Sequence, residues 1–81
     1  MPHFDFFWTD DIIAHIAEHD ITTKDFERVV MHPFDTDMSE SSDRHTAFGY
    51  TQDGRFIIAV YEYLDEITIL PVTAYEVPEP R

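Results

Sequence analysis

The sequence predicts a single α+β domain over residues 1–81, with a short N-terminal strand and two helices packed on one face of a three-stranded antiparallel meander. The length of 81 residues allows one small domain and leaves no room for a second. Apolar residues recur at helical spacing in the first part of the chain, and from residue 46 onward they alternate with a period of two. Hydrophobic residues make up 43% of the chain, more than an acidic disordered tail would carry.

The first part of the chain is expected to form the short strand and a first helix. Residues 4–8 are an aromatic segment that can pair as a strand, and Thr9 is a suitable N-cap for the helix that follows. Ile12 and Ile16 fall on the apolar face of this helix. Asp20 is expected to end it, because aspartate tolerates the left-handed conformation better than most residues.

A second helix is expected after a very short connection. Thr22 or Thr23 can cap it, and Asp25 approximates a capping box with Thr22, although its side chain is shorter than the usual glutamate. Phe26 and Val30 lie on the apolar side of this helix. Pro33 ends it, since proline disfavours helical geometry at the residue before it. The short connection predicts that the two helices pack as a hairpin or a bent pair.

The remaining half of the chain predicts the meander. Residues 35–45 are rich in serine and aspartate and are expected to form an exposed, mobile loop. Asp53 and Gly54 indicate a hairpin, because glycine readily adopts the positive φ that such a turn requires. Residues 56–61 are apolar on both faces, as is expected of a central strand.

A third strand is expected over residues 67–74, followed by an extended tail over residues 77–81. Pro71 has no amide hydrogen to donate to the sheet, so this strand should lie at an edge or form a bulge there. The predicted core contains five apolar residues: Ile12, Ile16, Phe26, Val30 and either Ile57 or Ile58.

The charge of the chain argues against several functions. Acidic residues number 17 and basic residues 5, giving a net charge of −12, whereas binders of nucleic acids and anionic membranes carry clustered Lys and Arg. Cysteine is absent, so neither disulfides nor thiolate chemistry is expected. No signal peptide, membrane-spanning segment or cofactor motif stands out, so we expect a cytoplasmic protein without a cofactor.

His15 and His19 belong to the segment His-Ile-Ala-Glu-His, which matches the pattern His-x-x-Glu-His of some zinc peptidases. The spacing places both imidazoles on neighbouring turns of a helix, with Glu18 beside them. Such enzymes need a third ligand and a substrate cleft, which a domain of this size can hardly supply. Two surface histidines are the better interpretation, and metal binding is the weaker alternative.

Arg44, His45 and Arg55 are the candidate residues for phosphate binding and proton transfer. Arg44 opens one predicted strand and Arg55 opens its hairpin partner, which places them at opposite ends of that pair. Separate surface salt bridges are therefore favoured over a joint anion site. His45 can act as a general base near neutral pH, but the sequence shows no partner that would orient it.

Several short motifs extend over most of the chain, from about position 6 to position 76. They are Phe7-Trp8-Thr9, His19-Asp20-Ile21, Phe26 with Val29-Val30, His32-Pro33, Arg44 with Gly49, Gly54-Arg55 and Val60-Tyr61. In these motifs the chain resembles the BrnT-like toxins of the RelE ribonuclease superfamily, each of which is the toxin half of a bacterial toxin–antitoxin pair. The resemblance implies a RelE-like fold, ribonuclease activity and an antitoxin partner.

The chain departs from that family in its charge. BrnT-like toxins are basic and generally carry arginine in the last strand, an Ala-Arg step after it and a further basic helix. Here Thr68 stands in the last strand, Tyr75 follows Ala74, and no basic helix follows. RNA cleavage without a general base depends on cations that hold phosphate and stabilise developing charge. These departures from the family therefore imply a retained fold and a lost activity.

Two hypotheses for the function follow from these observations. The leading one is a toxin-related protein that has lost ribonuclease competence and acts as an acidic protein-interaction module. The alternative is an active BrnT-like ribonuclease that uses Arg44, His45 and Arg55 and is kept inactive by an antitoxin. A surplus of aromatic residues on a sheet with helices for only one face predicts a contact surface. The candidate partners are a basic protein, an antitoxin-like protein or a second copy of the chain.

Overall fold

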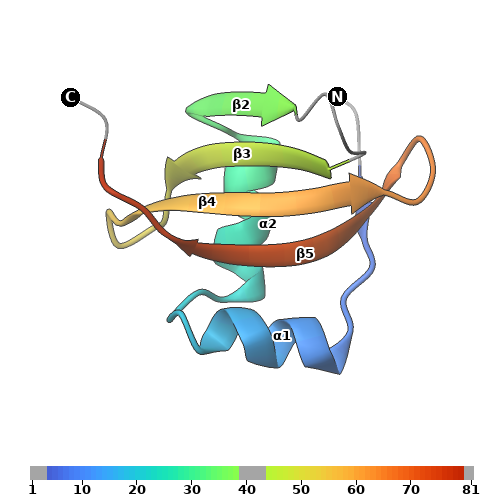
Figure 1. Cartoon of the computed structure of the whole chain (residues 1–81), viewed down its shortest axis with the longest axis horizontal. Coiled ribbons are helices and arrows are strands. Elements are labelled where there is room, and N and C mark those ends of the chain that lie inside the picture. Colours follow the sequence, from blue (N-terminus) through green and yellow to red (C-terminus); the bar gives the residue numbers. More distant parts are fainter. Residues whose placement is uncertain (1–3, 39–43, 80–81) are drawn as a thin grey trace.

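The chain forms one five-stranded mixed sheet and two helices, described by a computed structural model for residues 4–38 and 44–79 (Figure 1). In chain order the elements are β1 (Asp5–Phe6), α1 (Asp10–Ala17), α2 (Thr23–Met31), β2 (Asp35–Met38), β3 (Arg44–Tyr50), β4 (Phe56–Tyr63) and β5 (Thr68–Glu76). The strands lie in the order β1-β5-β4-β3-β2, so β4 is central, as predicted, and β2 forms one edge.

Both helices pack on the same face of the sheet, which confirms the predicted layering. Helix α2 crosses that face against β3 and β4, and α1 lies along β5, crosswise to α2, so the helices form a bent pair (Figure 1). Ile16 of α1 and Phe26 of α2 belong to one buried cluster with Ile57 of β4. Ile12 and Val30, two further predicted core residues, are partly buried against this cluster.

The opposite face of the sheet, called the open face below, is apolar as well. Successive side chains of a strand alternate between faces, so Ile58 points to the open face while Ile57 enters the core. Phe48 and Tyr50 of β3 and Phe56 of β4 share the open face and are in ring contact there. The open face is turned toward the viewer in Figure 1, with α2 behind the strands.

Local hydrogen bonds set the ends of the helices where the sequence predicts them. The Thr9 side chain accepts a backbone N–H in the first turn of α1, and Asp20 follows this helix with a φ of 60°. Thr22 and Asp25 form a complete capping box, in which each side chain accepts the other residue's backbone N–H. Helix α2 ends just before Pro33. The aspartate is therefore long enough for the box despite its shorter side chain.

The predicted hairpin and bulge are both present. Gly54 adopts a φ of 89° in the turn between β3 and β4, which pair as antiparallel strands. The pairing of β4 with β5 shifts between Val60 and Tyr61, which lie opposite Thr73 and Pro71. The sheet thus accommodates the proline, which has no amide hydrogen, by a local irregularity.

The prediction of a loop over residues 35–45 is wrong at both ends, because β2 and the start of β3 occupy them. Residues 39–43 of the predicted loop lie outside the described residues. Asp35 and Thr36 are exposed in β2. An edge strand has one paired side and needs no buried face, so polar residues are acceptable in it. The antiparallel meander of β3, β4 and β5 is therefore only part of the sheet.

The prediction also lacks the parallel pairing of β1. The short N-terminal strand is present, but it pairs with β5, where Asp5 lies opposite Thr68 and Phe6 opposite Ile69. These partners are far apart in the sequence, so neither a hydrophobic period nor a turn signal can reveal their pairing. The sheet is mixed for this reason, with β1 and β2 added on opposite sides of the meander.

Residues 77–79 follow β5 without helix or strand, in the first part of the predicted tail; residues 80–81 lie outside the described residues. The Val77 amide donates a hydrogen bond to the Phe56 carbonyl at 3.0 Å, which holds this segment beside β4. Neither of the described helices is long and apolar enough to cross a membrane.

Candidate functional site

The turn between β3 and β4 positions Arg55. The hydroxyl oxygen of Thr51, which is 3% exposed, accepts the backbone N–H of Arg55 at 3.0 Å. The Thr51 hydroxyl also donates a hydrogen bond to the carboxylate of Asp53. This bond, together with the nearby Arg55 guanidinium, holds the pKa of Asp53 below its usual value. The turn therefore presents an ionised aspartate next to the arginine.

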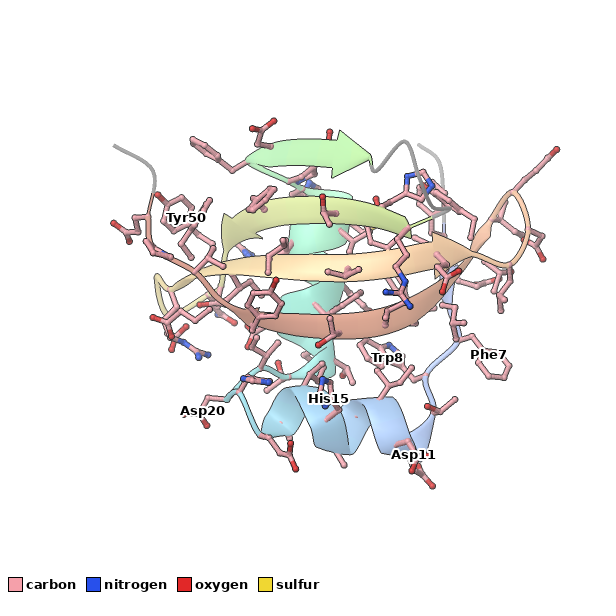
Figure 2. The ribbon with its side chains drawn as sticks, viewed as in Figure 1. Phe7, Trp8, Asp11, His15, Asp20 and Tyr50 are labelled. Carbon is pink, nitrogen blue, oxygen red and sulfur yellow. The ribbon has the colours of Figure 1, made fainter. Side chains whose placement is uncertain are left out.

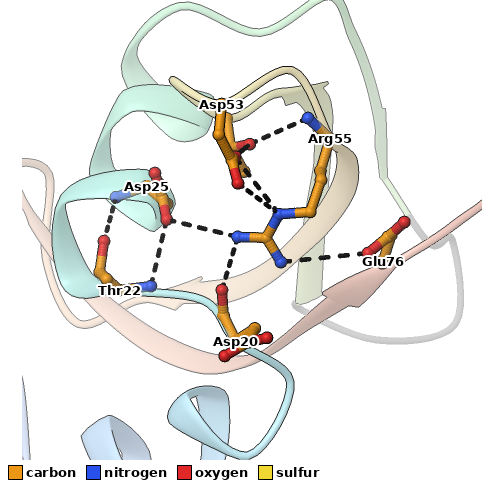
Figure 3. Close-up of polar contacts among 7 residues, drawn as sticks. Asp20, Thr22, Asp25, Asp53, Arg55 and Glu76 are labelled. Carbon is orange, nitrogen blue, oxygen red and sulfur yellow. Dashed lines mark hydrogen bonds and ion pairs between the residues drawn. The ribbon is translucent and has the colours of Figure 1, made fainter.

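The Arg55 guanidinium is directed into a set of acidic side chains (Figure 3). Its Nε donates to Asp53 Oδ2 at 3.1 Å, and its Nη2 donates to the backbone carbonyl of Asp20 at 2.6 Å. Nη2 also lies 3.9 Å from Asp25 Oδ2, and Nη1 lies 4.0 Å from Glu76 Oε1. The side chain is 25% exposed. Arg55 thus joins the helix–helix turn, α2, the β3–β4 hairpin and the end of β5.

An open, acidic cleft of about 890 Å³ surrounds Arg55. Four acidic residues line it, Glu18, Asp20, Asp53 and Glu76, together with His19, Tyr75 and Arg55 itself. An incoming phosphate would meet these negative charges, and the guanidinium donors that it needs already face carboxylate and carbonyl oxygens. The geometry around Arg55 therefore suits a structural arginine better than an anion-binding one.

Arg44 lies at the other end of the β3–β4 pair, as the sequence predicts. Arg44 is paired in register with Glu62, and its Nε lies 4.0 Å from Glu62 Oε2. Arg55 comes just before Phe56, which pairs with Tyr50 at the far end of β3. At about 3.3 Å per residue, the length of β3 separates the two arginines by roughly 20 Å. They cannot hold one phosphate group together.

His45 is half-buried beside two tyrosines. Its ring stacks on that of Tyr61 with the ring centroids 5.6 Å apart, and it lies edge to face with the ring of Tyr63 with the centroids 4.9 Å apart. Burial, with a smaller contribution from Tyr63, raises the pKa of Tyr61 to about 12. Because neighbouring residues of a strand point to opposite faces, His45 and Arg44 lie on opposite sides of the sheet. The structure therefore does not bring Arg44, His45 and Arg55 together.

His15 lies on α1, whereas His19 lies in the turn that follows this helix, so the prediction that one helix carries both imidazoles is wrong. Both rings face β5. The centroids of their rings are 5.6 Å apart, and His15 Nε2 shares a 2.8 Å hydrogen bond with the Thr73 hydroxyl. Figure 2 shows His15 on the side of α1 that faces the sheet. The His19 ring lies 6.4 Å from that of Tyr75. Among the residues that the structure describes, no group of three or more His, Cys, Asp or Glu side chains is arranged to hold a metal ion. The two histidines instead contact the β5 edge of the sheet.

A second hollow, called the apolar pocket below, lies on the open face and was not predicted. Its volume is about 280 Å³, and it is lined by Phe34, Asp35, Phe48, Phe56, Val77 and Pro78. The sequence predicts an aromatic contact surface but not where its residues gather. The available signal was Phe34, an aromatic residue placed directly after Pro33 and outside the periodicity of the helix.

Comparison with known proteins establishes the fold. No protein-family model matches the chain, and no curated protein matches it by sequence. Among solved structures, the crystal structure of the ribonuclease toxin BrnT from Brucella abortus is similar, with a TM-score of 0.69 and 13% sequence identity. The similarity covers 98% of this chain and 100% of that one. The chain therefore has a BrnT-like α+β fold over nearly its whole length.

Proposed function

We propose that this BrnT-fold protein is an acidic protein-interaction module without ribonuclease activity. The observation that carries the proposal is the environment of Arg55, whose guanidinium faces the carboxylates of Asp53, Asp25 and Glu76. An arginine engaged in this way is not free to hold a phosphate group. The acidic cleft around it would also oppose the approach of RNA.

The remaining candidate residues, Arg44 and His45, do not replace Arg55 as a phosphate-binding site. RNA cleavage requires preorganised cations where negative charge develops in the transition state. Arg44 faces Glu62 on the exposed sheet surface. If Arg44 instead paired with a phosphate of RNA, an exposed ion pair of this kind would contribute about 1 kcal/mol or less to binding. His45, the candidate for proton transfer, is stacked on Tyr61 on the opposite side of the sheet. Phosphate binding and proton transfer would thus be on different surfaces.

The charge of the chain favours a basic protein as its partner. A net charge of −12 repels nucleic acid and attracts a cationic protein surface. We infer that the chain is a divergent member of the RelE superfamily that has kept the toxin fold, lost the cationic set and retained binding to a basic or antitoxin-like protein. This also accounts for the apolar open face, which has the composition of a contact surface.

The test is RNA cleavage by the purified protein, with bacterial growth as the second measurement. We expect neither cleavage of RNA nor arrest of growth when the protein is expressed. The double variant Arg44→Ala, Arg55→Ala is assayed beside the wild type, and circular dichroism verifies that each protein is folded. Cleavage by the wild type that disappears in a folded double variant would overturn the proposal.

The second candidate function is a working ribonuclease toxin. The similarity to a ribonuclease toxin over the full length of the chain favours it. In that case Arg44 would bind phosphate, His45 would transfer the proton from its place beside Tyr61, and Arg55 would act only after its carboxylate partners move away. RNA cleavage that is lost in His45→Gln and kept in the matched variant His32→Gln would establish this alternative.

A further inference from the structure

The apolar pocket is held open by the backbone of the sheet. The Phe34 amide donates a hydrogen bond to the Phe48 carbonyl at 2.7 Å, and the Val77 amide donates one to the Phe56 carbonyl at 3.0 Å. The rings of Phe34 and Phe56 meet edge to face at 5.8 Å, and Phe48 stacks on Phe56 at 6.2 Å. Both walls are therefore tied to the sheet, and the pocket needs no rearrangement to accept an occupant.

The size and exposure of the pocket indicate what it accepts. Small-molecule sites typically measure about 300–1,000 Å³, so a pocket of about 280 Å³ lies just below that range and suits one large side chain. Phe34 is 62% exposed at its rim, and Tyr50, which packs against Phe34, is 39% exposed. Figure 2 shows Tyr50 at this end of the sheet. Exposed aromatic rings around a preformed pocket are typical of protein contact sites.

The charges beside the pocket select a cationic partner. Asp35 forms part of one wall. Glu76 pairs in register with the core residue Ile57 and therefore lies on the helix-covered face, beside Arg55. Arg55, which precedes the pocket residue Phe56, is engaged by Asp53 and Glu76. A second copy of the chain would bring another net charge of −12 to this acidic end of the molecule. A cationic segment would instead be attracted to Asp35 and to the net negative charge of the chain.

We propose that the apolar pocket binds a segment of a basic partner protein, which inserts one large apolar side chain between Phe34 and Phe56 and places Lys or Arg beside Asp35. The inference rests on the proposed function and names both the binding surface and the chemistry of the partner. The buried apolar residue supplies affinity, and the flanking cations supply specificity and faster association.

The test is binding of a short synthetic peptide in which one phenylalanine is flanked on both sides by lysines, measured by fluorescence polarisation at low salt. The matched peptide carries glutamates in place of the lysines. We expect the lysine peptide to bind and the glutamate peptide not to bind. Phe34→Ala should weaken binding by about tenfold or more, as truncation of a central aromatic contact does. Leu64→Ala, which truncates another exposed apolar residue in the β4–β5 loop, should leave binding within about twofold of the wild type.

Two charge-changing variants complete the test. Asp35→Lys and Glu66→Lys change the net charge equally, but only Asp35 lines the pocket. We expect Asp35→Lys to weaken binding several-fold more than Glu66→Lys. Any one of three results would overturn the inference: the lysine peptide fails to bind, the two members of either variant pair have equal effects, or the protein forms a dimer that is lost in Phe34→Ala. RNA cleavage tests the proposed function independently, so the two failures are distinguishable.

Discussion

The guanidinium of Arg55 donates a 2.6 Å hydrogen bond to the backbone carbonyl of Asp20, 35 residues earlier in the chain. Asp20 is the residue with a left-handed φ of 60° that ends the first helical segment. The contact therefore joins the sharp turn between the helices to the start of the central strand (Figure 3). Because carboxylates from three further segments of the chain face the same guanidinium, Arg55 is expected to support the fold.

Arg55→Ala should lower the free energy of unfolding by about 1–3 kcal/mol, because it removes a partly buried charged hydrogen bond and leaves several carboxylates facing one another. Urea unfolding monitored by circular dichroism measures the change. Arg44→Ala removes the same side chain from an exposed pair with Glu62 and should cost less than about 1 kcal/mol. Equal losses in the two variants would show that Arg55 has no special structural role.

Protonation of Asp53 should lower the stability of the protein in acid. Its pKa is lowered in the folded state, chiefly by the hydrogen bond from Thr51, so the contribution to stability is present above the unfolded pKa. It is lost as the pH falls through the folded pKa, because the protonated carboxyl no longer favours the folded form. Urea midpoints measured from neutral to strongly acidic pH should fall less steeply for Asp53→Asn than for the wild type. Parallel curves for the two proteins would contradict this assignment.

Tyr61 should act in the opposite direction at alkaline pH. Burial raises its pKa from 10.0 to about 12, so the neutral phenol is favoured in the folded state. Its contribution to stability is complete below pH 10.0 and is lost as the pH rises through the folded pKa of about 12. Ultraviolet titration of the folded protein should show a last phenol ionising near pH 12. That step should be absent in Tyr61→Phe and present in Tyr50→Phe.

Gly54→Val should destabilise the protein by about 1–2 kcal/mol through the backbone alone. Gly54 has a φ of 89°, and a Cβ atom built there would meet nothing within 4 Å. A clash of the Cβ atom with a packed neighbour therefore does not explain a loss of stability. Gly54→Asn is the matched control, since asparagine adopts positive φ more readily than valine. If thermal unfolding shows the same loss for both variants, the conformational explanation is wrong.

The amino-acid sequence by itself determined the features that depend on a few neighbouring residues. Thr9 and Thr22 cap the helices, Asp20 ends the first one, and Gly54 forms the hairpin turn. Pro71 lies at the irregularity in the pairing of β5. Each signal acts within a turn or along one strand, where hydrogen-bonding capacity and allowed backbone angles are intrinsic to the residue. The opposite placement of Arg44 and Arg55 followed in the same way from the hairpin.

Only the tertiary structure decided the features that join distant segments. The pairing of β1 with β5 and the edge strand β2 depend on backbone partners that no local pattern reveals. The acidic environment of Arg55 is of the same kind, because Asp20, Asp25 and Glu76 reach it from separate turns, helices and strands. A charged side chain takes whichever opposite charges the completed fold places beside it. The sequence therefore predicted where this arginine lies in its hairpin, and the packing of the chain decided which groups hold it.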